Sequence, residues 1–408
     1  MPINPQFAIL KSASFVLTAS LMLFALSLSA SAVDLYQIHW PIEGYKALVT
    51  LTNVTEDAVD VLISFVGRDG IKTLVKVVQP YTTVRVKLDE LLRGEGLIQA
   101  KFTAGKLKVI YWGIGQDGEV FGLPFVGVPR SRRFVFGRRE RGYLVLADLP
   151  TEIGVGAVVN VKLYNRRGKL IGSSMESIPE NGVRAIPVEG VGICLVEIKD
   201  GDVICGYRGM SGGDVIALNA LPVKEAARQI KLMPGPLGAD GELFVANLSR
   251  DGARVEITLE GDAEIRRMRK LIPGCGAVMI GLSGRLDKGR VVSISARSNR
   301  PLIGYYFPTP SAVIEPIGEL REGSLTTAVA SPVSGGKTSL LVINPTSRET
   351  SVRFGGYGRE PERGVLLKPG SWFSREVYST TPVKADGGII TLLVGYQGDR
   401  PVWAVQLK

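Results

Sequence analysis

The sequence predicts an all-β protein: four tandem immunoglobulin-like antiparallel β-sandwich domains after an N-terminal signal peptide. Three observations predict this fold: landmarks that recur at steps of 94 to 99 residues, short strands in which apolar and polar residues alternate, and turn residues between those strands. A closed barrel in each repeat is the second interpretation.

The repeat rests on three independent markers. A strand ends in a polar residue at Asn53, Asp148, Asn247 and Asn344. A proline turn joins two strands at Pro80, Pro179, Pro273 and Pro369. A late strand carries an aromatic residue at Trp112, Tyr207, Tyr305 and Trp403. We therefore expect repeats 1 to 4 to span residues 33–128, 129–224, 225–320 and 321–408, arranged as beads on a string or as a stiffer rod.

Each repeat is expected to hold seven or eight strands. The segment Val59 to Phe65 alternates apolar and polar residues, as a strand with one buried face does. The first strand is "LYQIHW" in repeat 1, matched by "RFVFG", "RQIKLM" and "LTTAVA". The last is "EVFGLP", matched by "DVIALNALP" and "SAVIEP", and the fourth repeat is expected to end without it.

The N-terminus has the pattern of a secretory signal peptide over residues 1–32. Lys11 precedes an uncharged apolar stretch that ends in Ala30-Ser31-Ala32, and an uncleaved membrane anchor is the alternative. No later segment is long and apolar enough to cross a membrane, so no transmembrane segment is expected in the mature chain. The predicted location is extracytoplasmic: periplasmic, on the cell surface or secreted.

Charge suggests the kind of partner. Loss of residues 1–32 removes one lysine, which leaves 48 basic against 39 acidic residues, a net charge of +9. An exported basic protein suits an acidic polysaccharide, lipopolysaccharide or an anionic membrane surface, although the same charge also serves solubility. Nucleic acid is not an expected partner in that compartment.

Motifs for catalysis or cofactors are weak. His39 is the one histidine, and we expect it to be an ordinary strand residue rather than a catalytic base. The carboxylate pairs Asp57/Asp60 and Asp117/Glu119 are expected on turns or solvated faces. The stretch "SGGKTSLL" resembles a phosphate-binding loop but precedes an expected strand instead of a helix. We expect no cofactor and no metal site.

Two features are candidate sites. The cluster "RSRRFVFGRRER" supplies guanidinium forks for an anionic partner at Arg130, Arg132, Arg133, Arg138, Arg139 and Arg141, with a solvated strand as the alternative. Cys194 and Cys205 flank an expected hairpin at Asp200-Gly201 and are a candidate disulfide or two buried thiols. Cys275 has no partner in its repeat.

Two sequons, Asn53-Val-Thr and Asn247-Leu-Ser, are candidate glycan acceptors. The equivalent Asn344 is followed by Pro345, which abolishes the sequon while the asparagine is kept. We therefore expect these asparagines to serve strand-end turns in which the side chain bonds nearby backbone.

The segments "SLLVINPTSRETSVRF", "LKPGSWFSREV", "GIITLLVGYQGDRPVWAV" and "ISARSNRPLIGYYF" resemble a tandem repeat of exported bacterial proteins. That resemblance covers residues 33–408 and implies extracytoplasmic immunoglobulin-like sandwich modules that act as scaffold or binding units, with no catalytic residue to transfer.

The predicted function is a non-catalytic exported scaffold or adhesion-type binding protein of the cell envelope, whose partner is an acidic polysaccharide or an envelope protein. A structural subunit of a surface layer or filament is one alternative. A secreted carbohydrate-active enzyme that uses a carboxylate pair is another. The sequence leaves the oligomeric state open.

Overall fold

The computed structural model describes most of the chain after the signal segment. The predicted signal peptide lies outside the described residues, except for Ala32. The described ranges are 32–89, 91–103, 107–116, 119–129, 131–138, 141–150, 155–211, 214–238, 241–261, 264–286, 291–309, 312–315, 325–329, 337–355, 363–377, 380–397 and 400–407. Within these ranges the protein is all-β, as predicted, with several antiparallel sheets and two 3₁₀ turns.

Repeat 1 forms two facing sheets. Its strands are β1 (Ala32–His39), β2 (Tyr45–Asn53), β3 (Val59–Gly67), β4 (Gly70–Val78), β5 (Thr83–Lys87), β6 (Gly96–Thr103), β7 (Leu107–Gly115), β8 (Val120–Pro124) and β9 (Val126–Gly127). One sheet has the order β4-β3-β6-β1-β9 and the other β5-β2-β7-β8. Their apolar inner faces pack into one core.

Repeat 2 repeats this arrangement. Its elements are β10 (Arg133–Arg138), β11 (Gly142–Asp148), β12 (Ala157–Asn165), β13 (Leu170–Ile178), β14 (Val183–Val188), β15 (Gly192–Asp200), β16 (Val203–Ser211), β17 (Asp214–Asn219), β18 (Leu221–Pro222) and the 3₁₀ turn η1 (Val223–Glu225). The sheet orders β13-β12-β15-β10-β18 and β14-β11-β16-β17 match those of repeat 1 strand for strand.

In repeat 3 a single long strand joins the two sheets. The elements are β19 (Ala227–Leu232), η2 (Gly235–Leu237), β20 (Glu242–Asn247), β21 (Ala253–Gly261), β22 (Ile265–Ile272), β23 (Ala277–Gly281), β24 (Val291–Thr309) and β25 (Ala312–Ile314). The first half of β24 pairs with β19 and β21, and its second half pairs with β20. This one strand takes the places that β6 and β7 occupy in repeat 1.

Repeat 4 has the strands β26 (Leu325–Val329), β27 (Lys337–Ile343), β28 (Thr350–Phe354), β29 (Arg363–Leu367), β30 (Trp372–Glu376), β31 (Thr381–Ala385), β32 (Ile390–Gln397) and β33 (Arg400–Leu407). The predicted first strands of the four repeats correspond to β1, β10, β19 and β26. The stretch after the glycine-rich loop is β27, so the strand interpretation of "SLLVIN" is confirmed.

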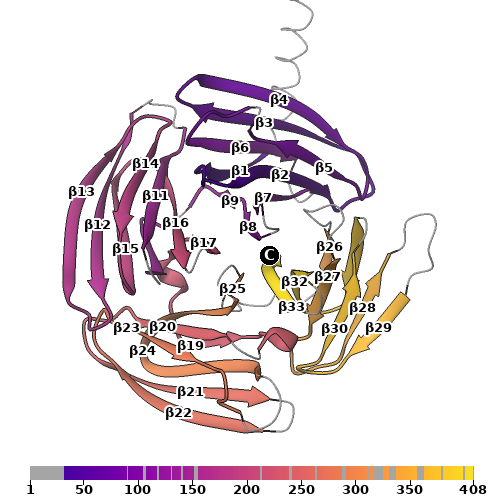
Figure 1. Ribbon diagram of the computed structural model, residues 1–408. Helices are drawn as coiled ribbons and strands as arrows, with labels where there is room; N and C mark the ends of the chain where they lie inside the picture. The colour runs from indigo at the N-terminus through magenta and orange to yellow at the C-terminus, as the bar shows by residue number, and fades with distance from the viewer. Residues whose placement is uncertain are drawn as a thin grey trace, which may run out of the picture.

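The repeats do not form a string or a rod. They close into a ring, with repeats 1 and 4 side by side and the C-terminal strand at the centre (Figure 1). Buried apolar side chains of repeat 1 pack against repeat 2, those of repeat 2 against repeat 3, those of repeat 3 against repeat 4, and those of repeat 4 against repeat 1. The prediction of extended beads is wrong because neighbouring repeats bury apolar side chains against one another all around the ring, and a linear array leaves the two end faces exposed.

Burial follows distance from the ring centre. We call Asn53, Asp148, Asn247 and Asn344 the marker residues, and the strands that end at them the marker strands. These strands are almost wholly buried, as in β27, where only Lys337 is exposed. The next strands, such as β3, alternate, and the outermost strands, such as β4 and β22, are mostly exposed. Inner strands covered on both faces have continuous apolar sequences, which is why "YLVLAD" and "SLLVI" do not alternate.

Four strands, one from each repeat, meet at the centre. β8 packs against β17 and β33, and β25 pairs in parallel with β33 through Val313 and Val405. The Gln37 Nε2 donates to the carbonyl of Pro124 at 2.9 Å, and the Asn219 Nδ2 donates to the same oxygen at 2.9 Å. We call this arrangement of β8, β17, β25 and β33 the hub.

The hub corrects two sequence predictions for repeat 4. β33 pairs with β32 as β8 pairs with β7, so the fourth repeat does have the final strand that it was expected to lack. Trp403 lies on β33, whereas Trp112, Tyr207 and Tyr305 lie on strands that pair with the marker strand. The spacing of 98 residues from Tyr305 to Trp403 therefore does not join equivalent positions.

The marker asparagines are fully buried and close the strand-end loops, as predicted. The Asn53 Nδ2 donates to the carbonyls of Asp57 and Val78 at 2.7 and 2.9 Å, while its Oδ1 accepts the Thr55 N–H at 2.8 Å. Asn247 and Asn344 make the same set of bonds in their own repeats. A glycan cannot be accommodated on Asn53 or Asn247 in the folded protein, because the Nδ2 is enclosed and bonded.

Each marker residue is also tied to its proline turn. The backbone N–H groups of Asn53, Asp148, Asn247 and Asn344 donate to Thr82, Gly182, Gly276 and Ser371. The third residue of each turn has positive φ: Tyr81, Asn181, Cys275 and Gly370. A type II turn requires this conformation, which glycine adopts without strain and other residues adopt at a cost. The predicted proline turns are therefore confirmed in all four repeats.

Asp148 makes fewer bonds than the asparagines it replaces. Its Oδ2 accepts the Asn181 N–H at 3.0 Å, but its buried Oδ1 has no hydrogen-bond partner among the described residues. Burial raises the pKa of the carboxyl from 3.8 to about 6, against the opposing effect of the Asn181 bond. The ionised carboxylate is thus held where the other repeats place an amide donor.

We expect Asp148→Asn to stabilise the protein at pH 7 by about 1–3 kcal/mol, because an amide supplies the missing donor. The pKa of Asp148 is higher in the folded protein than in the unfolded chain. Its contribution to the free energy of unfolding is therefore fully present below about pH 4 and is lost as the pH rises through about 6. Urea midpoints at pH 4, 5 and 7 check both statements. A wild-type and a variant midpoint that change in parallel with pH would contradict them.

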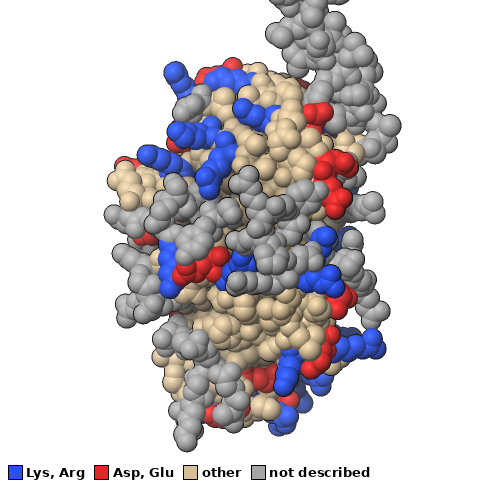
Figure 2. Space-filling model, turned by 90° about the vertical axis from the view of Figure 1, so that its right-hand side faces the viewer, with Lys and Arg blue, Asp and Glu red and all other residues tan. Residues whose placement is uncertain are grey.

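The side of the ring that Figure 2 shows carries both signs of charge. Figure 2 shows basic and acidic side chains interspersed over the side of the ring formed by repeats 1 and 4, with a group of basic residues at the top, over repeat 1. Among the described residues, no helix has the length and apolar character that a membrane crossing requires.

Candidate binding pocket

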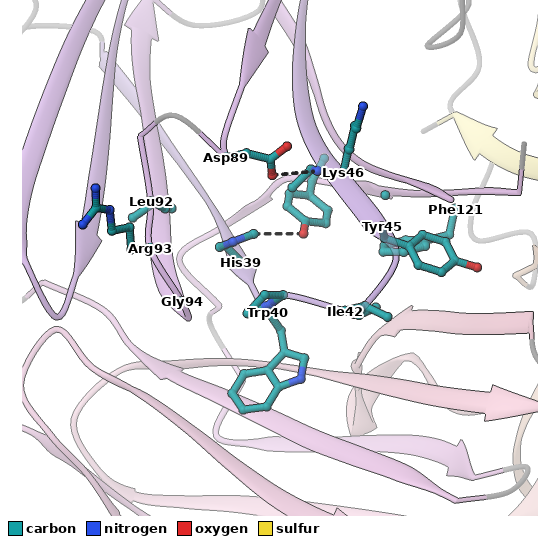
Figure 3. A pocket seen from close by; sticks show the side chains of 14 residues that line it. His39, Trp40, Ile42, Tyr45, Lys46, Asp89, Leu92, Arg93, Gly94 and Phe121 are labelled. Atoms are coloured by element: carbon teal, nitrogen blue, oxygen red, sulfur yellow. Dashed lines mark hydrogen bonds between the residues drawn. The ribbon is translucent and has the colours of Figure 1, made fainter. Parts of the chain in front are cut away.

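A pocket of about 290 Å³ opens at one end of the repeat 1 sandwich (Figure 3). Two connections and the strands beside them form it: the chain from Trp40 into β2, the described residues Asp89 and 92–94 between β5 and β6, and Phe121 near the start of β8. Binding sites often lie on loops that a rigid β scaffold holds in place. The pocket is therefore where the described part of repeat 1 is best suited to hold a ligand.

Local sequence explains the shape of the loops. Pro41 lacks an N–H and restricts Trp40 to extended backbone, which ends β1. Gly44 has φ +81° as the third residue of a turn closed by the Tyr45 N–H and the Ile42 carbonyl. This turn directs the chain back across the pocket into β2.

Aromatic side chains form one wall of the pocket. Ring centroids are 5.9 Å apart for His39 and Tyr111, 6.1 Å for Tyr111 and Phe121, and 5.8 Å for Phe121 and Tyr45. The Phe121 ring covers Gly113 on the neighbouring strand, where a Cβ would lie 2.1 Å from the ring. Only glycine at position 113 leaves room for the Phe121 ring, so this position fixes part of the wall.

His39 and Tyr111 give this wall its polar character. The His39 Nδ1 lies 3.0 Å from the Tyr111 hydroxyl. The pKa of His39 is lowered to about 4, mainly by burial; the Asp89 charge opposes this shift and the Arg208 charge adds to it. Burial also raises the pKa of Tyr111. Both groups are neutral at pH 7, so they act as hydrogen-bonding groups and not as charges.

Charged groups lie around the mouth of the pocket. The Asp89 carboxylate accepts the Ala47 N–H at 3.3 Å, and the side chains of Lys46 and Arg93 extend away from the centre (Figure 3). All three residues are exposed. Neither cation forms an ion pair with another described residue, so both are available to a ligand at the rim.

The pocket adjoins the boundary with repeat 2. The Trp40 ring packs on Tyr143 of β11 with centroids 5.8 Å apart. Behind the wall, Arg208 of β16 is buried and its Nη1 donates to the carbonyls of Tyr207 and Leu218 at 3.0 and 3.2 Å. Burial lowers the pKa of Arg208 to about 10, which leaves it charged at neutral pH. The contact between repeats thus fixes one side of the pocket.

The described arginines of the predicted cluster lie at the two ends of β10 and within it, and these four do not form one patch. Arg132 and Arg133 are exposed at the start of β10, and Arg141 is exposed beyond its end, where its Nη2 pairs with Glu189 at 2.8 Å. Arg138 is buried, and its guanidinium donates to the carbonyls of Glu189 and Tyr164. Arg130 and Arg139 lie outside the described residues. The six-residue strand separates the two ends by roughly 16 Å, since a strand rises about 3.3 Å per residue.

The cysteines do not flank a hairpin. β15 and β16 follow one another through Asp200-Gly201 but belong to different sheets, because β15 pairs with β10 and β12 while β16 pairs with β11 and β17. Cys194 and Cys205 are therefore buried free thiols on facing sheets. Burial raises the pKa of Cys194 to about 12 and that of Cys205 as well, which makes both poor nucleophiles.

The remaining candidates are dispersed. Asp57 lies in a strand-end turn and Asp60 on the exposed face of β3. Asp117 lies outside the described residues, and the Glu119 Oε2 accepts the Tyr45 hydroxyl at 2.6 Å. Cys275 occupies the third turn position, with its Sγ 3.7 Å from the Ser249 carbonyl. Among the described residues, no cluster of three or more His, Cys, Asp or Glu side chains could hold a metal ion.

This pocket was not predicted from the sequence. His39 was expected to be an ordinary strand residue, and Tyr45, Asp89, Arg93 and Phe121 were not among the candidate site residues. These residues come from β1, β2, β8 and the connection between β5 and β6, and only the fold brings them together. The one feature of the local sequence that marked this region was the Trp40-Pro41 pair next to the single histidine of the chain.

Comparisons with known proteins identify no family for this chain. No protein-family model matches the chain, and the search of curated proteins found no match. Among solved structures, an α-L-rhamnosidase of Streptomyces avermitilis is similar at 8% identity and a TM-score of 0.17, over 73% of this chain and 44% of that one. The chain thus spans less than half of that enzyme. A tetra-tandem repeat from the extending region of a large adhesion protein is similar at 9% identity and a TM-score of 0.14, over 91% of this chain and 99% of that one.

Proposed function

We propose that this protein is an exported, non-catalytic binding scaffold of the cell envelope, made of four tandem immunoglobulin-like repeats, in which repeat 1 presents a ligand pocket. The pocket carries this proposal. Its aromatic wall offers flat apolar surface, its polar groups offer directed hydrogen bonds, and the ring holds the loops that form it. This combination is typical of small-molecule and saccharide recognition.

The electrostatics of the pocket support binding over catalysis. His39 and Tyr111 are neutral and bonded to each other, and Glu119 is engaged by Tyr45, so each of these groups already makes one bond within the wall. Asp89 is the carboxylate that lines the mouth. A binding role needs only its acceptor oxygen, whereas hydrolysis by a carboxylate pair needs a second carboxyl group at a defined separation.

A glycan array probed with the purified protein tests the proposal. We expect binding to a subset of saccharides and a loss of about tenfold or more in affinity for Asp89→Ala, since a hydrogen bond to a charged group contributes about 1.5–3 kcal/mol. Asp60→Ala, which removes an exposed carboxylate from β3 of the same repeat, is the matched control and should bind as the wild type does.

Three outcomes would overturn the proposal. Wild-type protein that binds no glycan removes the pocket as a saccharide site. Shortened products from a bound oligosaccharide, detected by chromatography, would show the carbohydrate-active enzyme instead. Growth of large particles in light scattering at micromolar concentration would show the structural subunit of a layer or filament.

A further inference from the structure

We propose that the pocket of repeat 1 recognises a single sugar ring that carries a carboxylate, such as a uronic acid unit of a polysaccharide. This inference rests on the proposed binding function and adds the chemical class of the ligand and the residues that select it. The sequence predicted an acidic partner at the arginines around β10, and we now expect such a partner to bind at this pocket instead.

The size of the pocket limits the ligand. Its volume of about 290 Å³ lies at the lower end of the range of about 300–1,000 Å³ that small-molecule pockets have. One sugar ring fits such a space, and an oligosaccharide must extend beyond its mouth.

The wall suits the two kinds of surface that a sugar presents. The rings of Tyr45 and Phe121 offer flat apolar area to the C–H face of a pyranose. The His39 Nδ1 is engaged by Tyr111, so its Nε2 is the ring nitrogen left to bond a hydroxyl group. The Asp89 carboxylate accepts one N–H from Ala47 and has further acceptor sites for sugar hydroxyls.

Charge at the mouth selects the acidic form. Lys46 and Arg93 line the pocket together with one carboxylate, Asp89, and the neutral His39 adds no charge. Among the lining residues two cations therefore stand against one carboxylate, and the Glu119 carboxylate, bonded to Tyr45, lies next to this lining. Because the side chains of Lys46 and Arg93 extend outward from the mouth (Figure 3), a carboxylate on the ligand is expected at the rim, where the guanidinium of Arg93 offers the planar fork that matches it.

Titration with galacturonate and with galactose tests the inference, followed by tryptophan fluorescence because Trp40 lies in the pocket. We expect galacturonate to bind the wild type more tightly than galactose. The double variant Lys46→Gln/Arg93→Gln should lower the affinity for galacturonate about fivefold and leave that for galactose unchanged, since each exposed ion pair contributes about 0.5 kcal/mol. The preference should fall as salt is raised.

The control is Lys72→Gln/Lys87→Gln, which removes the same charge from exposed positions on β4 and β5 that do not line the pocket. It should leave both affinities unchanged, and Trp372→Phe should leave the fluorescence response intact. Equal binding of both sugars, unaffected by Lys46→Gln/Arg93→Gln, overturns the acidic specificity while the scaffold function stands. Binding of neither sugar, with glycan binding that survives Asp89→Ala, overturns the pocket as the site.

Discussion

Ending the chain after Gln397, which removes β33, is expected to destabilise repeat 1 as well as repeat 4. β33 pairs with β32 along its length, pairs in parallel with β25, and packs against β8 at the hub. Its loss uncovers the hub and breaks the contact that closes the ring. We expect a loss of more than about 5 kcal/mol, beyond the usual range of single substitutions.

Hydrogen exchange locates this effect. In the shortened protein, amides of β8 (Val120–Pro124) should lose protection although they lie far from the deletion in sequence, and calorimetry should show a lower and broader transition. Removal of Lys408 alone is the control and should change neither measurement. Unchanged protection in β8 would show that β33 does not hold repeat 1 in the ring.

Asn247→Ala is expected to cost about 3–4 kcal/mol, the largest effect of any single polar substitution that we predict. The Asn247 Nδ2 donates to the carbonyls of Asp251, Ile272 and Pro273, and its Oδ1 accepts the Ser249 N–H. Alanine leaves these groups enclosed without partners, and each such buried group costs about 1–3 kcal/mol. Two loops of repeat 3 lose their common anchor.

Chemical denaturation measures this cost, with Asn299→Ala as the control. The Asn299 Oδ1 also accepts a backbone N–H, from Arg254, but its side chain is exposed, so water replaces the bond and the change should stay within about 1 kcal/mol. A loss below 1 kcal/mol for Asn247→Ala would mean that the loop closes without its asparagine.

The local fold was predictable because its signals are local. Asn53 and its equivalents were identified as turn residues, and the proline turns were placed correctly, since hydrogen bonding within a few residues fixes both. Alternation in β3 correctly marked a strand with one buried face. These features depend on neighbours that the sequence itself places close together.

The closed ring was not predicted, although the inner strands contained a sign of it. The strands "YLVLAD" and "SLLVI" are apolar on both faces. In an isolated sandwich each strand has one face in solvent, so only its other face needs apolar residues. The turn at Asp200-Gly201 shows a different limit. A turn residue reports where the chain reverses but not whether the next strand joins the same sheet, so the predicted Cys194–Cys205 hairpin was wrong.

The burial of Asn53 and Asn247 has a consequence for producing the protein. Their N-x-S/T triplets are accessible while the chain is unfolded, and a eukaryotic secretory pathway glycosylates such triplets before folding is complete. A modified Nδ2 could no longer enter the enclosed loop or donate to both of its carbonyl partners. Secretion from a glycosylating host should therefore yield misfolded chains, and expression in a host without that machinery should yield the ring.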